Sequence, residues 1–252
     1  MPPRLRPGPA AWGRLLGVGA LVAWIGVLLG AGGLVLAPVP GVRRRFRIWL
    51  FQAGPRWLLG WLRAEVAVVG PPPAPPFLLV ANHLSYLDVL VLASRLPGCV
   101  FVAKAEVRSW PLLGPICRGF GTIFIDRKSR RDVLCSLRGI EETLNEGDGV
   151  VLFPEGTSSG GATVGSFHSP LLALAARSSS PIHAAAIGYP SSEVCWWGDA
   201  ELVPHLLRLC AMARIEARVR FCDTPVASTD RKRLAEKLRT EVLRQRELAG
   251  TE

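Results

Sequence analysis

Apolar and polar residues form alternating blocks along the chain, and these blocks predict strands and helices in turn. Short apolar runs typical of buried strands occupy residues 77–82, 99–104, 121–126, 149–154, 182–188 and 213–222. Amphipathic segments predict helices at residues 85–95, 131–146, 168–178, 200–212 and 229–247. This alternation favours an α/β fold, with a mixed, largely parallel sheet flanked by helices.

The N-terminal quarter follows a different pattern. Residues 15–42 carry no charge, and at about 1.5 Å per residue a helix of this length crosses the roughly 30 Å hydrocarbon core of a bilayer. Residues 46–51 and 56–62 mix arginine with tryptophan, leucine and phenylalanine, which is typical of a helix at a membrane surface. Glycines and prolines within residues 30–40 favour a re-entrant or in-plane hairpin over a simple span. A cleaved signal peptide is the alternative, but the apolar run is long for one.

We therefore expect three parts. Residues 1–70 form a membrane-anchoring helical segment, residues 71–76 a proline-rich linker, and residues 77–252 the α/β domain. The sequence GPPPAPP that contains the linker favours a stiff polyproline conformation.

Charge is concentrated in the same N-terminal segment. The net charge is +10, and residues 1–65 hold nine arginines and one acid. Because these arginines accompany tryptophan, leucine and phenylalanine, they favour an anionic membrane surface over a nucleic acid. Basic residues flank the apolar run on both sides, so the positive-inside rule prefers neither end, and a hairpin with both ends on the cytoplasmic side fits this symmetry better than a simple span. The six cysteines show no paired metal-ligand spacing and are expected to be reduced thiols.

The candidate chemistry lies at strand ends. His83 and Asp88 belong to the block NHLSYLD at residues 82–88, directly after a buried strand. An imidazole oriented by a carboxylate is what a general base needs to take a proton from a hydroxyl. Ser85 and Asp88 also fit a helix capping box, and the two roles are compatible. Since the sequence shows no serine or cysteine placed to act as a nucleophile for this pair, the substrate's own hydroxyl is the expected nucleophile.

Three further strand-associated blocks are unusual. GTIFIDR at residues 121–127 ends in Asp126 and Arg127, for which a strand-terminal ion pair is the alternative interpretation. FPEGTSS at residues 153–159 places Glu155 in a tight turn, because proline and glycine flank it. PIHAAAI at residues 181–187 contains His183, which is expected to be a core or supporting residue rather than a catalytic one.

A serine hydrolase is a weak alternative. Residues 156–160 match the pattern G-x-S-x-G around Ser158, and Asp199 and His205 follow in hydrolase order. That elbow requires a helix directly after the serine, and the glycine-rich residues 160–165 are a poor helix start.

Together the four blocks resemble the glycerolipid acyltransferase family, which includes bacterial 1-acyl-glycerol-3-phosphate acyltransferases. They appear in family order, the segment VAKAE at residues 102–106 is also family-like, and the resemblance covers about residues 75–225. It implies an enzyme of the inner membrane with its acyltransferase domain on the cytoplasmic side. The implied reaction moves a fatty acyl group from acyl-CoA or acyl carrier protein to the hydroxyl of 1-acyl-sn-glycerol 3-phosphate, giving phosphatidic acid.

The resemblance also implies site residues. His83 is the base, Asp88 orients it, Glu155 and Gly156 help to hold the acceptor, and Arg127 binds the acceptor's phosphate. The other residues expected to contact substrate are Asn82, Lys104, Asp126, Thr157 and Ser158. Because a thioester is already activated, base catalysis, positioning and charge stabilisation suffice, and no metal or other cofactor is expected.

One position departs from the phosphatidate-forming pattern. Those members usually carry arginine where this chain has Ser158, so a bidentate phosphate contact is missing. FPEGTSS with the later Phe167-His168-Ser169 also resembles a branch that acylates lyso-ornithine lipids or other lysolipids. A phosphomonoester acceptor remains the favoured expectation at this stage. A lipid-binding protein on an inactive acyltransferase fold is the non-enzymatic alternative, against which the intact pair of His83 and Asp88 argues.

Overall fold

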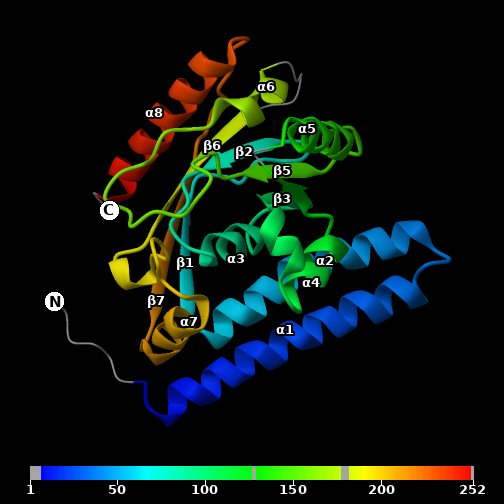
Figure 1. The fold of residues 1–252 in the computed structure, drawn as a ribbon, viewed down its shortest axis with the longest axis vertical. Coiled ribbons are helices and arrows are strands. Elements are labelled where there is room, and N and C mark those ends of the chain that lie inside the picture. The colour runs from blue at the N-terminus through cyan, green and yellow to red at the C-terminus, as the bar shows by residue number, and fades with distance from the viewer. Residues whose placement is uncertain (1–6, 127–128, 177–181, 251–252) are drawn as a thin grey trace.

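A mixed sheet forms the centre of the protein (Figure 1). The computed structural model describes residues 7–126, 129–176 and 182–250, and within these ranges seven strands pair in the order β1-β7-β6-β2-β5-β3-β4. The strands are β1 (Ala64–Val69), β2 (Leu78–Ala81), β3 (Cys99–Lys104), β4 (Ile123–Ile125), β5 (Gly149–Leu152), β6 (Ile182–Gly188) and β7 (Ile215–Phe221). The neighbouring strands β6, β2, β5, β3 and β4 are parallel to one another. Strand β7 pairs antiparallel with β6, and β1 pairs parallel with β7. This is the largely parallel α/β sheet that the sequence predicts.

Helices cover both faces of this sheet, as Figure 1 shows. They are α1 (Pro9–Val35), α2 (Pro40–Trp61), α3 (Leu87–Ala93), α4 (Leu113–Gly119), α5 (Arg130–Asn145), α6 (Leu172–Ala175), α7 (Leu202–Ala211) and α8 (Arg231–Gly250), with short 3₁₀ turns at Ala105–Ser109, Ser169–Leu171 and Ser192–Val194. Leu78 and Val80 of β2 pack toward α5, α6 and α8, whereas Leu79 and Ala81 pack toward α2 and α3. The alternation along one buried strand therefore builds two cores.

The N-terminal helices α1 and α2 form a hairpin (Figure 1). A Cβ atom at Gly17 would lie 2.2 Å from the ring of Trp61, and one at Gly32 would lie 2.2 Å from the ring of Phe46. These two glycines therefore let the helices approach closely along their length. Helix α1 is long and apolar enough to cross a membrane.

The inner side of this hairpin is part of the protein core. Leu50, Leu58 and Leu62 are buried in one cluster with residues of α7 and β7. Arg56 donates to the carbonyl of Ser94 at 3.0 Å, and Gln52 donates to that of Leu96 at 2.6 Å, both at the C-terminal end of α3. Helix α2 is thus bonded to the helix that carries Asp88.

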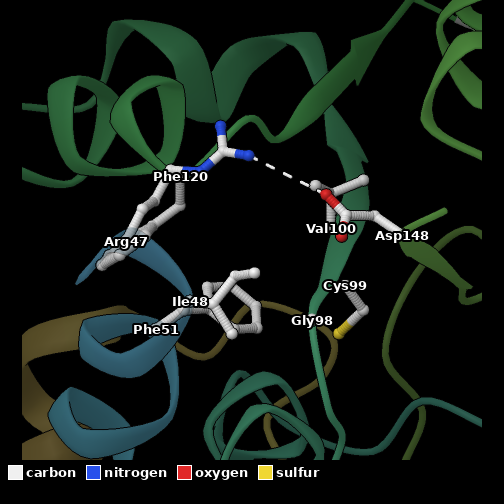
Figure 2. Close-up of a pocket in the computed structure, with 8 residues that line it drawn as sticks. All are labelled: Arg47, Ile48, Phe51, Gly98, Cys99, Val100, Phe120 and Asp148. Carbon is white, nitrogen blue, oxygen red and sulfur yellow. Dashed lines mark ion pairs between the residues drawn. The ribbon is translucent and has the colours of Figure 1, made fainter. Parts of the chain in front are cut away.

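Some of the basic residues that were counted as membrane flanks have partners within the protein. Figure 2 shows a small cavity between α2 and the start of β3, where Asp148 forms an ion pair with Arg47 at 3.9 Å. Asp148 also forms an ion pair with Arg44. Its lining residues are Arg47, Ile48, Phe51, Gly98, Cys99, Val100, Phe120 and Asp148. Arg14 donates to carbonyls at the C-terminal end of α7. Arginines of the N-terminal segment therefore also attach the hairpin to the α/β domain through ion pairs and hydrogen bonds.

The structure differs from the sequence prediction in several elements. The sequence prediction assigns residues 64–69 to the membrane segment, but they form the edge strand β1, which pairs with β7. Four of its six residues are exposed and none is fully buried. The proline-rich residues 71–76 consequently join two strands of one sheet. Helix α4 was not predicted, and the helix predicted at 168–178 is reduced, within the described residues, to a 3₁₀ turn and the four-residue α6.

Candidate active site

The strand order brings the predicted site residues to one edge of the sheet. Parallel strands β2, β5, β3 and β4 are neighbours, so their carboxyl ends lie side by side. His83 follows β2, Glu155 follows β5, Lys104 ends β3 and Asp126 follows β4. Residues that are up to 72 positions apart in sequence, such as His83 and Glu155, therefore become neighbours.

His83 and Asp88 form the predicted pair. Nδ1 of His83 lies 2.8 Å from Oδ2 of Asp88, and Asp88 is fully buried. The same oxygen accepts the backbone N–H groups of Leu84 at 2.6 Å and Ser85 at 3.0 Å. Because this oxygen already accepts two fixed donors, we assign the ring hydrogen to Nδ1, which leaves a lone pair on Nε2. The carboxylate accepts backbone N–H groups at the start of α3 and also holds the imidazole. The capping role and the pairing with His83, both considered from the sequence, are therefore compatible in the structure.

The imidazole of His83 remains accessible. Its side chain is 20% exposed, and its ring stacks on Phe153 with centroids 4.3 Å apart. Among the residues that the structure describes, none forms a hydrogen bond with Nε2. A substrate hydroxyl can therefore approach the nitrogen that carries the lone pair.

Tyr189 is a site residue that the sequence analysis missed. It directly follows β6, and its hydroxyl donates to Oδ1 of Asp88 at 2.7 Å. Burial, and then the charge of Asp88, hold the pKa of this phenol well above its usual value, so it stays a neutral donor. Tyr189 reaches Asp88 because β6 pairs with β2. No local motif in the sequence indicates this contact.

Glu155 organises the backbone around His83. One carboxylate oxygen accepts the N–H of His83 at 2.8 Å, and the other accepts the N–H of Gly165 at 2.7 Å. The side chain is buried, and the turn that follows it uses a positive φ of 80° at Gly156. Its observed partners are thus backbone groups of the protein, while Thr157 beside it is exposed.

Asn82 connects two strands. Its amide donates to the carbonyl of Ile187 at 2.9 Å and accepts the N–H of the same residue at 2.8 Å. The side chain is fully buried. We expected Asn82 to contact substrate, but in the structure it fixes the end of β2 against β6 instead.

Ser158 points toward protein atoms. Its hydroxyl donates to the backbone carbonyl of Trp196. The backbone N–H of Trp196 donates in turn to the carbonyl of Leu84 at 2.8 Å. His205 is buried and bonds to Tyr86 and to the carbonyl of Glu193. No helix begins directly after Ser158, so the arrangement that a serine hydrolase needs is not formed in this part of the structure.

The remaining predicted positions complete the edge. Lys104 is exposed at the end of β3 and is in register with Ile125, next to Asp126. Arg127 lies outside the described residues. His183 is paired with Leu79, four residues before His83, so it lies toward the opposite end of the strands. Within the described ranges, no three His, Cys, Asp or Glu side chains are grouped to hold a metal ion.

Comparison with known proteins identifies the family of this chain. A family model described as Acyltransferase matches residues 65–188. The chain is 34% identical over 232 residues to the lyso-ornithine lipid O-acyltransferase of Pseudomonas aeruginosa, covering 88% of this chain and 86% of that one. The chain belongs to the glycerolipid acyltransferase family. It is also 31% identical to the 1-acyl-sn-glycerol-3-phosphate acyltransferase of Neisseria meningitidis, covering 77% of this chain and 88% of that one.

A solved structure of this family has the same fold. The crystal structure of the 1-acyl-sn-glycerophosphate acyltransferase of Thermotoga maritima matches with a TM-score of 0.63 and 24% identity, over 95% of this chain and 98% of that one. The likeness includes the N-terminal region as well as the sheet, because nearly the whole chain is covered. The family and the curated relatives show that the protein is an acyltransferase of lipid metabolism.

Proposed function

We propose that the protein transfers a fatty acyl group from a thioester of CoA or acyl carrier protein to the free hydroxyl of a lysolipid. The observation that carries this proposal is the hydrogen bond of 2.8 Å between His83 Nδ1 and Asp88, with Nε2 left as the base. The carboxylate fixes the ring and stabilises the positive charge that the ring acquires when it takes the proton.

The proposed reaction needs no residue as nucleophile. Nε2 of His83 accepts the proton of the acceptor hydroxyl while its oxygen attacks the thioester carbonyl. The tetrahedral intermediate then expels the thiolate, and the imidazolium returns its proton to that sulfur. An ester and a free thiol are the products, and the protein contributes positioning and proton transfer.

We propose lyso-ornithine lipid as the acceptor. Ser158 stands where phosphate-binding members carry arginine, and its hydroxyl is bonded to the carbonyl of Trp196. Three relatives with this substrate in their names are 34%, 34% and 36% identical to the chain. This reverses the preference that the sequence motifs suggested. Lysophosphatidate is the second candidate, supported by the Neisseria relative and by Arg127, which directly follows Asp126 in the sequence.

An acceptor panel tests both levels of the proposal. Wild type and His83→Ala are assayed for thiol release from one acyl-CoA with lyso-ornithine lipid, lysophosphatidate, glycerol 3-phosphate and lysophospholipids. We expect His83-dependent transfer that is fastest with lyso-ornithine lipid. Preference for lysophosphatidate would reject the acceptor only, whereas transfer that is independent of His83 would reject the mechanism.

We further propose that the protein works at the cytoplasmic side of the inner membrane, with the outer side of α1 in contact with lipid. Large apolar side chains on that helix are exposed, with exposed fractions of 50–79% at Trp12, Leu16, Trp24, Val27, Leu34 and Val35. Such a contiguous apolar surface is unusual for a protein surrounded by water alone. Membrane lipid is therefore a partner of the hairpin as well as the source of the acceptor.

A further inference from the structure

Arg239 of α8 reaches the loop that follows β5. Its Nη2 and Nε atoms donate to the carbonyl oxygen of Val164 at 2.8 and 3.2 Å, and Nε also donates to the carbonyl of Gly165 at 2.9 Å. The guanidinium is half-buried, and the carbonyl of Val164 thus receives two N–H groups from one planar cation.

The same peptide group contacts Glu155 on its other side. The carbonyl of Val164 and the N–H of Gly165 belong to one peptide unit, and that N–H donates to Glu155 Oε2 at 2.7 Å. Glu155 Oε1 in turn accepts the N–H of His83 at 2.8 Å. A chain of hydrogen bonds therefore leads from α8 to the backbone of the proposed base.

Gly165 makes the close approach in this chain of bonds possible. A Cβ atom at this position would lie 2.9 Å from Glu155 Oε2, closer than Cβ atoms normally come to any heavy atom. Without a side chain at residue 165, the peptide N–H can face the carboxylate directly. A peptide group that accepts from a cation at its oxygen is polarised, and its N–H becomes a stronger donor.

We propose that Arg239 is a positioning residue of the active site, which acts through the Val164–Gly165 peptide and Glu155 to hold the backbone of His83. It contacts neither substrate nor the reacting atoms. Its effect is expected in kcat rather than in the KM of the acyl donor, because it sets the geometry of the base. This inference rests on the proposed role of His83 as the base.

The test compares arginines of one helix. Arg239→Gln removes the cation and its paired contact, and Arg239→Lys keeps the charge but concentrates its N–H donors on a single nitrogen. Arg246→Gln is the matched control, since Arg246 donates to the carbonyl of Gly161 in the same loop but not to the peptide that contacts Glu155. The side chain of Arg244 pairs with Glu241 on the same helix. The Arg244→Gln variant therefore controls for the loss of one positive charge from α8.

We expect Arg239→Gln to lower kcat roughly 10- to 100-fold with little change in donor KM, and Arg239→Lys to recover part of that loss. Gly165→Ala should give a loss similar to that of Arg239→Gln, because its Cβ displaces Glu155. Arg246→Gln should leave kcat within about threefold of wild type, although both glutamine variants can lower the melting temperature.

A double-mutant cycle with Glu155→Gln decides the route of coupling. If Arg239 acts through Glu155, Arg239→Gln costs much less in the Glu155→Gln background than in wild type. Equal losses in both backgrounds, or equal losses for the Arg239→Gln and Arg246→Gln variants, would overturn the inference in favour of simple loop tethering. Unchanged activity of His83→Ala would instead reject the proposed base, whatever Arg239 does.

Discussion

The hydroxyl of Tyr189 lies 2.7 Å from Oδ1 of Asp88, on the opposite carboxylate oxygen from His83. Asp88 thus receives four donors: the imidazole of His83, the backbone N–H groups of Leu84 and Ser85, and this phenol. Because the carboxylate is fully buried, its orientation depends on these donors rather than on water.

Tyr189→Phe should therefore affect both stability and turnover. Removing the hydroxyl leaves a buried carboxylate oxygen with one donor fewer, which costs about 1–3 kcal/mol in the free energy of unfolding. We also expect kcat to fall several-fold, since Asp88 holds the imidazole of His83, the proposed base. Urea unfolding and steady-state kinetics measure the two effects.

Tyr86→Phe is the matched control for this variant. The hydroxyl of Tyr86 bonds to Nδ1 of His205 at 2.9 Å and does not contact Asp88. It should lower stability while leaving kcat close to wild type. A Tyr189→Phe enzyme with wild-type kcat would show that this phenol supports the fold alone.

The pair of His83 and Asp88 makes the strongest kinetic prediction. His83→Ala should lower turnover by about 10²–10⁴, which is the usual scale for a lost general base. Asp88→Asn should cost less in turnover, because the imidazole remains in place. Thiol release from acyl-CoA measures both variants, and circular dichroism verifies their folds. Near-wild-type transfer by His83→Ala would contradict the mechanism.

Membrane binding should depend on the outer side of α1. Substituting Trp12, Leu16, Trp24 and Val27 by glutamine should move the protein from the membrane fraction to the soluble fraction, because apolar burial dominates the binding. High salt should not release the wild type, since salt screens only the charged contribution. Release by a salt wash alone would indicate a peripheral, electrostatic attachment.

The control for this variant must leave the core intact. Deletion of residues 1–66 is unsuitable, since it removes Leu50, Leu58 and Leu62 from a buried cluster. Serine substitutions at Val68 and Val69, which are exposed on β1, change apolar surface away from α1. This variant should stay in the membrane fraction.

Ser158→Arg should change acceptor preference. A guanidinium at this position can form a charge-assisted hydrogen bond of about 1.5–3 kcal/mol with a phosphate, so use of lysophosphatidate should improve roughly tenfold or more. Lyso-ornithine lipid should be used less well, because its head group already carries an amine. The acceptor panel measures kcat/KM for each lipid.

Ser158→Ala separates the new charge from the lost hydrogen bond. It removes the bond to the carbonyl of Trp196 without adding a cation. This variant should keep the wild-type order of acceptors at a reduced rate. An unchanged order in Ser158→Arg would show that residue 158 does not face the head group.

The predicted contact between His83 and Asp88, which the structure contains, depends on local sequence. Asp88 is five residues from His83, and a strand followed by the first turn of a helix fixes their separation in almost any α/β context. The buried runs that form β2, β5 and β6 are equally local signals, because each strand is covered on both faces.

The parts that could not be predicted depend on contacts between distant segments. Tyr189 is 101 residues from Asp88, and the pairing of β6 with β2 brings them together. Strand β1 is mostly apolar, but most of its residues are exposed, and its place at the sheet edge depends on pairing with the distant β7. Arg239 looks like any solvated cation on a charged helix, and only the packing of α8 shows its carbonyl partners.

The bonds from α2 to the end of α3 have a consequence for how the protein can be divided. A helix of seven residues is too short to persist by itself, so α3 keeps its place only through neighbours at both ends. Asp88 lies at one end, and the carbonyls of Ser94 and Leu96, held by Arg56 and Gln52, lie at the other. The N-terminal hairpin and the pair of His83 and Asp88 therefore belong to one cooperative folding unit, and trimming the hairpin to obtain a soluble protein would loosen the carboxylate that holds the imidazole of His83.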